Sequence, residues 1–240
     1  MVPEGALIRG VLLGALTVAL VAAAGASAAA IAGECRGLQT CVPIAGPWVR
    51  IPARTSAGAP EAVYLVTCPR NHVAGGTDAL VADRSTDVSF RGATGSPVAP
   101  GVTTERSVLF TGTYGGASRR PTSYRPLVGC VPASGGGGRS QTAYQPGRPI
   151  VREVLTVALV RGRTRVVIVS CRNGGRLLGA SHAVGFVQRS EPSENVLASV
   201  SASHDVAGGR VVARGALAAA APAGVRARLQ VHAICRRGGQ

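Results

Sequence analysis

Two pairs of cysteines at nearly equal spacing constrain the fold of this 240-residue chain more than any other feature. The first pair lies 62 positions apart and the second pair lies 64 positions apart. Each of these four cysteines ends an apolar segment with the residue types of a β-strand. A shorter pair, six positions apart, precedes them, and no C-x-x-C zinc motif occurs. We therefore predict three disulfides: Cys35–Cys41, Cys68–Cys130 and Cys171–Cys235.

The last of these apolar segments, VRARLQVHAIC at 225–235, alternates between apolar and polar residues. Side chains on a strand point to opposite faces with a period of two, so the pattern predicts a strand with one buried and one solvated face. Polar residues fill the predicted solvated face: Arg226, Arg228, Gln230 and His232. We accordingly expect His232 to lie at the surface, together with His72 and His204.

Ten further segments have the same strand character, and turn-forming glycines and prolines separate them. The predicted strands are 48–51, 62–68, 86–90, 107–114, 124–130, 150–160, 164–171, 178–187, 196–201 and 210–217. The sequence RGR between 150–160 and 164–171 predicts a hairpin in which Gly162 supplies the turn. Helical periodicity is nearly absent after the leader, so we predict an all-β fold.

The paired cysteine spacing predicts that the chain contains an internal repeat. The tripeptide CVP occurs at 41–43 and again at 130–132, and both copies precede a Gly/Pro-rich loop and a strand into the next cysteine. We predict a first β-sandwich domain at 35–130, a Gly/Pro-rich connector at 131–149 and a second β-sandwich domain at 150–240.

A disulfide that joins strands about 60 residues apart resembles the inter-sheet bridge of immunoglobulin-like domains. The chain therefore resembles secreted bacterial proteins with tandem immunoglobulin-like β-sandwich domains, and the resemblance implies that each long-range disulfide links two sheets. The sequence departs from that family in one respect. Immunoglobulin domains pack a tryptophan on the bridge from between the two cysteines, whereas Trp48 precedes both long-range pairs.

The N-terminal segment 1–28 has the features of a secretory signal peptide. Residues 10–33 carry no charge, and the small residues ASA at 26–28 form a cleavage signal. The alternative is an uncleaved anchor, because the uncharged run is long enough to span a bilayer. We predict a secreted or cell-envelope-associated protein that has no stable membrane span once the leader is cleaved.

The chain has 26 arginines, no lysine and 11 acidic residues, which gives a formal charge of +15. Such a charge is typical of proteins that bind polyanions, although a composition rich in Arg, Ala and Gly gives the same balance without a binding site. The predicted polyanion-binding arginines fall on strands and on the hairpin turn of the second half: Arg161, Arg163, Arg165, Arg210, Arg214, Arg226 and Arg228.

The sequence holds no G-x-S-x-G elbow, P-loop, H-E-x-x-H motif or convincing pair of carboxylates. Asp78 and His182 fall at matching positions of the repeat, so they form either a polar site between the two copies or a pair of solvated loops. We predict no catalytic residues, no cofactor and no metal site. The expected function is that of a non-catalytic binding protein or a cell-envelope-associated structural protein, with an unknown protein or envelope polymer as partner. Polyanion binding is one alternative, and an extracellular enzyme is another.

Overall fold

A computed structural model describes residues 33–38, 40–55, 58–94, 98, 105–133 and 150–237. The predicted leader 1–28 lies outside the described residues, as does most of the predicted connector. Val131 and Pro132 still belong to a strand, so the prediction that a connector begins at 131 was wrong at its first positions. Among the described residues, no helix is both long and apolar enough to cross a bilayer.

The described part of the chain is all-β, as predicted, apart from a short 3₁₀ helix η1 (Gly33–Cys35) and one turn of helix α1 (Glu194–Ala198). The strands of the first half are β1 (Val42–Ala45), β2 (Trp48–Ile51), β3 (Ala62–Thr67), β4 (His72–Val81), β5 (Thr86–Gly92), β6 (Ser107–Tyr114) and β7 (Thr122–Pro132). The strands of the second half are β8 (Ile150–Ala158), β9 (Arg163–Ser170), β10 (Arg176–Phe186), β11 (Val200–Ala207), β12 (Arg210–Leu217) and β13 (Ala227–Arg236).

The largest sheet has seven strands in the order β1-β7-β2-β10-β13-β8, and β4 also pairs with β7. All of its pairings are antiparallel. Strands β1 and β2 pair with successive parts of β7, so they follow one another along one edge of that strand while β4 lies along the other. Strands from both halves of the chain thus belong to one sheet.

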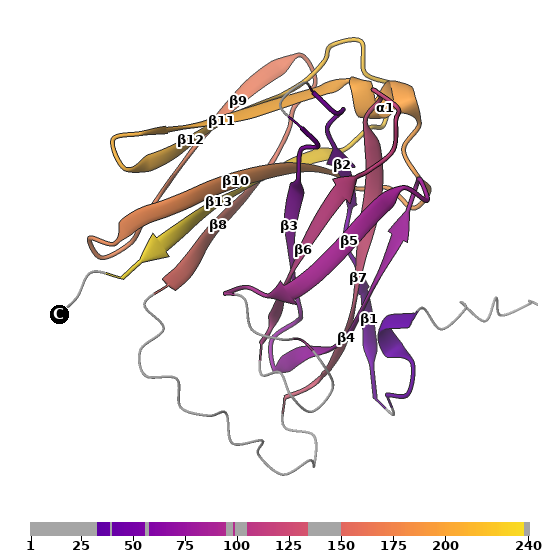
Figure 1. Cartoon of the computed structure of the whole chain (residues 1–240), viewed down its shortest axis with the longest axis vertical. Coiled ribbons are helices and arrows are strands. Elements are labelled where there is room, and N and C mark those ends of the chain that lie inside the picture. Colours follow the sequence, from indigo (N-terminus) through magenta and orange to yellow (C-terminus); the bar gives the residue numbers. More distant parts are fainter. Residues whose placement is uncertain are drawn as a thin grey trace, which may run out of the picture. The chain divides into compact units, whose positions relative to one another are not determined.

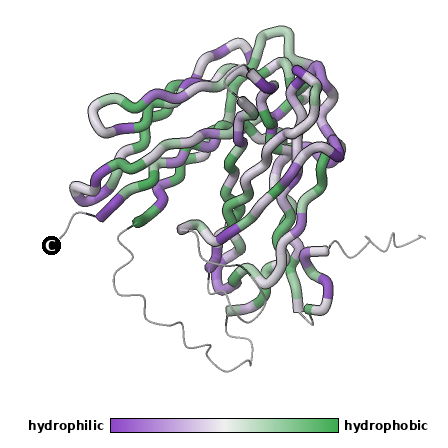
Figure 2. Tube along the Cα trace, viewed as in Figure 1, coloured by the Kyte–Doolittle hydropathy of each residue, from purple (hydrophilic) through white to green (hydrophobic). Residues whose placement is uncertain are grey.

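Two smaller sheets cover this large sheet, one in each half (Figure 1). The sheet β3-β6-β5 packs against β2 and β7, and buried residues such as Ile51, Phe110 and Tyr124 fill the space between them. The sheet β11-β12, with β9 alongside β12, packs against β10, β13 and β8. Hydrophobic stretches follow strands in both halves (Figure 2), so each half has an apolar core.

The three predicted disulfides are confirmed: Cys35–Cys41, Cys68–Cys130 and Cys171–Cys235. Each long-range bridge joins the large sheet to the strand layer that covers it, because Cys130 and Cys235 lie in β7 and β13 while their partners directly follow β3 and β9. A cystine therefore ties together the two layers of each half.

The two halves meet where β2 pairs with β10, a boundary that we call the seam. Trp48 and Val49 pair with Phe186 and Gly185. Trp48, from the first half, is buried in the core of the second half, while Ala183 of the second half is buried in the core of the first. The halves predicted as tandem domains therefore share a sheet and exchange core residues across the seam.

Three local predictions were wrong. Strands β8 and β9 do not form a hairpin, since β8 pairs with β13 while β9 lies beside β12, although Gly162 does adopt a positive φ between them. The predicted strand 196–201 begins as helix α1 and becomes a strand only at β11. The long strand β4 was missed because its two adjacent glycines resemble a turn.

Strand β13 also differs from its predicted solvated face. Arg228 is exposed as expected, but Gln230 and His232 are buried, and the prediction of a surface His232 was wrong. Strand β13 is covered on both faces, because β12 packs on one side while Leu65 of β3 and Arg152 of β8 contact Gln230 and His232 on the other.

Candidate functional site

Two of the pockets formed by the described residues are lined from both halves of the chain. The larger, of about 360 Å³, we call the Arg50 pocket, and the smaller, of about 200 Å³, we call the Tyr114 pocket. Helix α1 is close to both, because the carbonyl of Leu197 contacts Arg50 while the Leu197 side chain lines the Tyr114 pocket. Binding pockets often form where two structural layers or domains meet, so the pockets beside the seam are the candidate functional site.

Arg50 contributes the cation of the larger pocket. It lies in β2, whose apolar neighbours Val49 and Ile51 are fully buried on the opposite side of the strand. Its Nε donates a hydrogen bond to the Leu197 carbonyl at 2.9 Å, which fixes the direction of the guanidinium. Burial lowers the pKa of Arg50 below the ordinary arginine value, although the group remains charged at neutral pH.

Two histidines of the second half line the same pocket. The Nδ1 atoms of His182 in β10 and His204 in β11 lie 2.7 Å apart, so one ring donates to the other, and the rings meet edge to face. The pKa of His182 is lowered, first by burial and then by the nearby His204 and Arg50, while the Ala202 carbonyl acts in the opposite direction. Burial and these nearby charges therefore favour the neutral form of His182.

The remaining walls of the Arg50 pocket are mainly apolar, and they include Pro52, Pro60, Val63 and Val184. Glu61 lines the pocket from an exposed position. This arrangement places one fixed cation and two imidazoles against an apolar surface, which is typical of sites that recognise a small organic anion.

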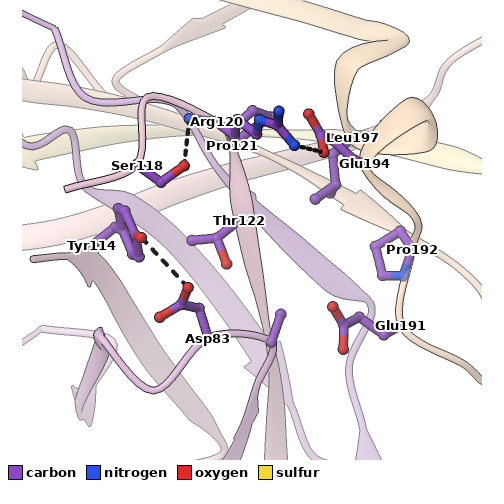
Figure 3. Close-up of a pocket in the computed structure, with 11 residues that line it drawn as sticks. Asp83, Tyr114, Ser118, Arg120, Pro121, Thr122, Glu191, Pro192, Glu194 and Leu197 are labelled. Carbon is purple, nitrogen blue, oxygen red and sulfur yellow. Dashed lines mark hydrogen bonds and ion pairs between the residues drawn. The ribbon is translucent and has the colours of Figure 1, made fainter. Parts of the chain in front are cut away.

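The Tyr114 pocket differs, since its arginine is paired with a carboxylate of the same pocket (Figure 3). Arg120 forms an exposed ion pair with Glu194 at 2.7 Å. The Tyr114 hydroxyl lies 3.4 Å from Asp83, whose other carboxylate oxygen accepts the Ser85 amide of the following turn. The polar groups of this pocket thus have roles in holding loops and α1 in place.

The predicted site that combines Asp78 with His182 is wrong. Asp78 lies in β4, where its carboxylate accepts the backbone amides of Gly33 and Ala79, next to the η1 segment. The adjacent Glu34 is buried, and its pKa is raised by that burial and by the charge of Asp78. His182 does line a pocket between the halves, but its partner is His204.

The seven arginines predicted to bind polyanions are all exposed. They are distributed over several elements: β9 carries Arg163 and Arg165, β12 carries Arg210 and Arg214, and β13 carries Arg228. Arg161 and Arg226 lie in adjoining loops. Among the residues that the structure describes, Arg214 has an acidic partner, Asp205, at 3.1 Å, and the other six have none within salt-bridge distance.

Sequence reasoning missed Arg50 and His204 as site residues, although it singled out His182 with another partner. The available signal was weak, since one arginine interrupts the short apolar strand WVRI. The six cysteines, by contrast, were all placed correctly. In the described ranges, no three His, Cys, Asp or Glu side chains come together as a metal site.

Comparisons with family models, curated proteins and solved structures give no match for this chain.

Proposed function

We propose that the protein is an exported, non-catalytic binding protein that works outside the cytoplasm, either secreted or associated with the cell envelope. The observation that carries this proposal is the set of three disulfides, two of which join the layers of a β-fold. Disulfides of this kind form and persist in oxidising compartments outside the cytoplasm. A cross-linked β framework is suited to holding binding groups in fixed positions.

Cell fractionation tests the export part of this proposal. The full chain, expressed in a bacterial host with its leader, is expected to appear outside the cytoplasm with the mass that follows cleavage of 1–28. Its six cysteines are expected to resist alkylation unless a reductant is added. Recovery in the cytoplasm with an intact leader and free thiols would contradict the proposal.

Binding to isolated cell-envelope fractions tests the second part. The oxidised protein is expected to co-sediment with either a wall or a membrane fraction, or to capture a soluble small molecule that mass spectrometry identifies. A protein that is exported but retains nothing in either assay would leave the export intact and contradict the binding role.

Polyanion binding is a second candidate, favoured by six of the seven predicted arginines, which are exposed and lack an acidic partner among the described residues. Arginine contacts to a polyanion release counterions, so affinity for polyphosphate should fall steeply between about 50 and 200 mM salt. Replacing Arg163, Arg165 and Arg210 by glutamine should weaken that binding and make the salt dependence shallower. Binding that ignores both the salt and the substitutions would contradict this candidate.

A further inference from the structure

The Arg50 pocket contains a positive charge that the described part of the protein does not neutralise. Among the described residues, no carboxylate lies within salt-bridge distance of the Arg50 guanidinium. Glu61 lines the same pocket but forms no ion pair with Arg50. Partly buried charges in proteins are usually paired, because burial without a partner is costly. An unpaired guanidinium that is partly buried in a pocket indicates an anionic ligand.

The hydrogen bonding of Arg50 leaves its two terminal amino groups available for an anionic ligand. Its Nε is used by the Leu197 carbonyl, and no acceptor contacts its two terminal amino groups in the described structure. Those two groups form the fork that binds a carboxylate or a phosphate through two parallel hydrogen bonds. The Leu197 contact holds the fork in place before a ligand arrives, which reduces the entropy lost on binding.

The histidine pair places two imidazole rings beside Arg50 in the pocket. The Nδ1 atoms of His182 and His204 are hydrogen-bonded to each other, which holds both rings in position. The apolar walls, which include Pro60, Val63 and Val184, supply a surface for the non-polar part of a ligand.

We propose that the Arg50 pocket binds the carboxylate or phosphate group of a small, partly apolar molecule, with Arg50 as the principal ligand-binding residue. This proposal rests on the binding role proposed above and names the chemical class of the ligand. The volume of about 360 Å³ limits the ligand to a small molecule, because it is near the lower end for ligand pockets.

A metal ion is the rival occupant, since histidines commonly bind metals. Two features oppose it. The 2.7 Å contact between the Nδ1 atoms of His182 and His204 is a hydrogen bond, so the lone pair of one Nδ1 is already used. The nearby charge of Arg50 repels a cation, and it already disfavours protonation of His182.

Calorimetric titration of the full, oxidised protein tests the proposal with four probes: benzoate, phenyl phosphate, benzamide and Zn²⁺. Benzoate or phenyl phosphate should bind, and the tighter of the two identifies the headgroup. Benzamide has a similar shape but no charge, so it should bind at least about tenfold more weakly, since charged hydrogen bonds are roughly twice as strong as neutral ones. Binding of Zn²⁺ without binding of either anion would overturn the proposal.

Three substitutions localise the binding. The R50Q variant should weaken anion binding at least about tenfold, because the fork and its charge are lost. Glu61→Gln should strengthen it about two- to threefold by removing an opposing charge from the pocket. The matched control R70Q removes an exposed arginine in the turn after Cys68, outside the pocket lining, and it should change the affinity less than twofold. Equal affinities in R50Q and the unmodified protein would overturn the proposal.

Val63→Trp provides a test that leaves every charge in place. Val63 lines the pocket from β3, so a larger side chain there should fill the space and abolish anion binding. Thermal melting and disulfide mapping verify that each variant is folded. If no probe anion binds while the protein still binds its envelope fraction, the pocket proposal fails and the proposed function stands; failure of both assays removes the binding role itself.

Discussion

The side-chain amide of Gln230 makes the two hydrogen bonds with the Leu65 backbone that a neighbouring strand would otherwise make. Its Oε1 accepts the Leu65 amide at 2.6 Å, and its Nε2 donates to the Leu65 carbonyl at 3.2 Å. Leu65 lies in β3, which is at the edge of its sheet, while Gln230 lies in β13 of the other half. The contact therefore satisfies an open strand edge and connects the two halves beyond the seam.

Replacing Gln230 by leucine should destabilise the protein by about 3 kcal/mol. The substitution leaves the Leu65 amide and carbonyl without their partners in a partly buried site, and it also removes the acceptor at 2.9 Å from the buried His232 Nε2. Urea unfolding measures the free energy of unfolding. The control is Gln188→Leu, because the Gln188 amide makes an exposed hydrogen bond. Equal stability of the two variants would contradict a structural role for Gln230.

How far the sequence predicts this fold is clearest in β13. The alternation of 225–235 correctly predicts a strand and its buried apolar face. It cannot show that Gln230 and His232 are buried too, because their partners come from β3 and β8, and Leu65 is 165 positions away. Periodicity reports which residues share a face, whereas burial of a polar face depends on packing that only the folded chain provides.

The candidate site was less predictable than the disulfides for a related reason. Cysteine chemistry allows few uses, so spacing alone indicates the pairs. Arg50 is one of 26 arginines, and only its position in β2 beside Leu197 and the two pocket histidines sets it apart. Nothing in the local sequence distinguishes a half-buried arginine from an exposed one.

His232 should make the stability of the protein depend on pH. Burial, with the nearby charges of Arg152 and His182, lowers the pKa of His232 to about 3, whereas its ordinary value is 6.5. The unfolded chain therefore takes up a proton as the pH falls below 6.5, while the folded protein does not until about pH 3. The stabilisation is complete above pH 6.5 and declines by up to about 1.4 kcal/mol per pH unit below it.

Urea unfolding at pH 7, 6, 5 and 4 measures this effect. H232Q keeps a donor toward Gln230 and an acceptor toward Arg152, so it should lose less stability between pH 7 and pH 4 than the unmodified protein does. The control H72Q alters a histidine whose hydrogen bond is exposed, and its pH profile should match that of the unmodified protein. Parallel profiles for all three proteins would rule out the buried neutral His232.

Trp48 should report on the unfolding of both halves at once. It is the only tryptophan of the chain, and although it lies in the first half, it is buried in the core of the second. Its fluorescence and the far-ultraviolet circular dichroism should therefore change in a single, coincident transition. Two separate transitions would show that the halves unfold independently.

Removing the Trp48 ring should lower the stability of the protein, because the ring is buried in the core of the second half. Trp48→Ala is expected to destabilise the protein by about 3 to 5 kcal/mol, because it leaves a cavity in the core of the second half. Urea unfolding followed by circular dichroism measures the loss of stability, since the variant lacks the tryptophan fluorophore. Phe90→Ala is the control, because Phe90 is 46% exposed and its removal should cost far less.

Gly129 should tolerate no side chain, because the η1 segment lies directly on it. A Cβ at Gly129 would overlap the Glu34 carbonyl and lie 2.8 Å from the Cys41 sulfur. Gly129→Ala should therefore push the segment around Cys35–Cys41 away from β7 and destabilise the protein by about 1 to 3 kcal/mol. Thermal melting and limited proteolysis near residues 33–41 measure the two effects. Gly179→Ala is the matched control within a strand, because its Cβ would meet Ile234 at an ordinary 3.4 Å. If both variants melt at the same temperature and resist cleavage equally, the η1 segment does not pack on β7.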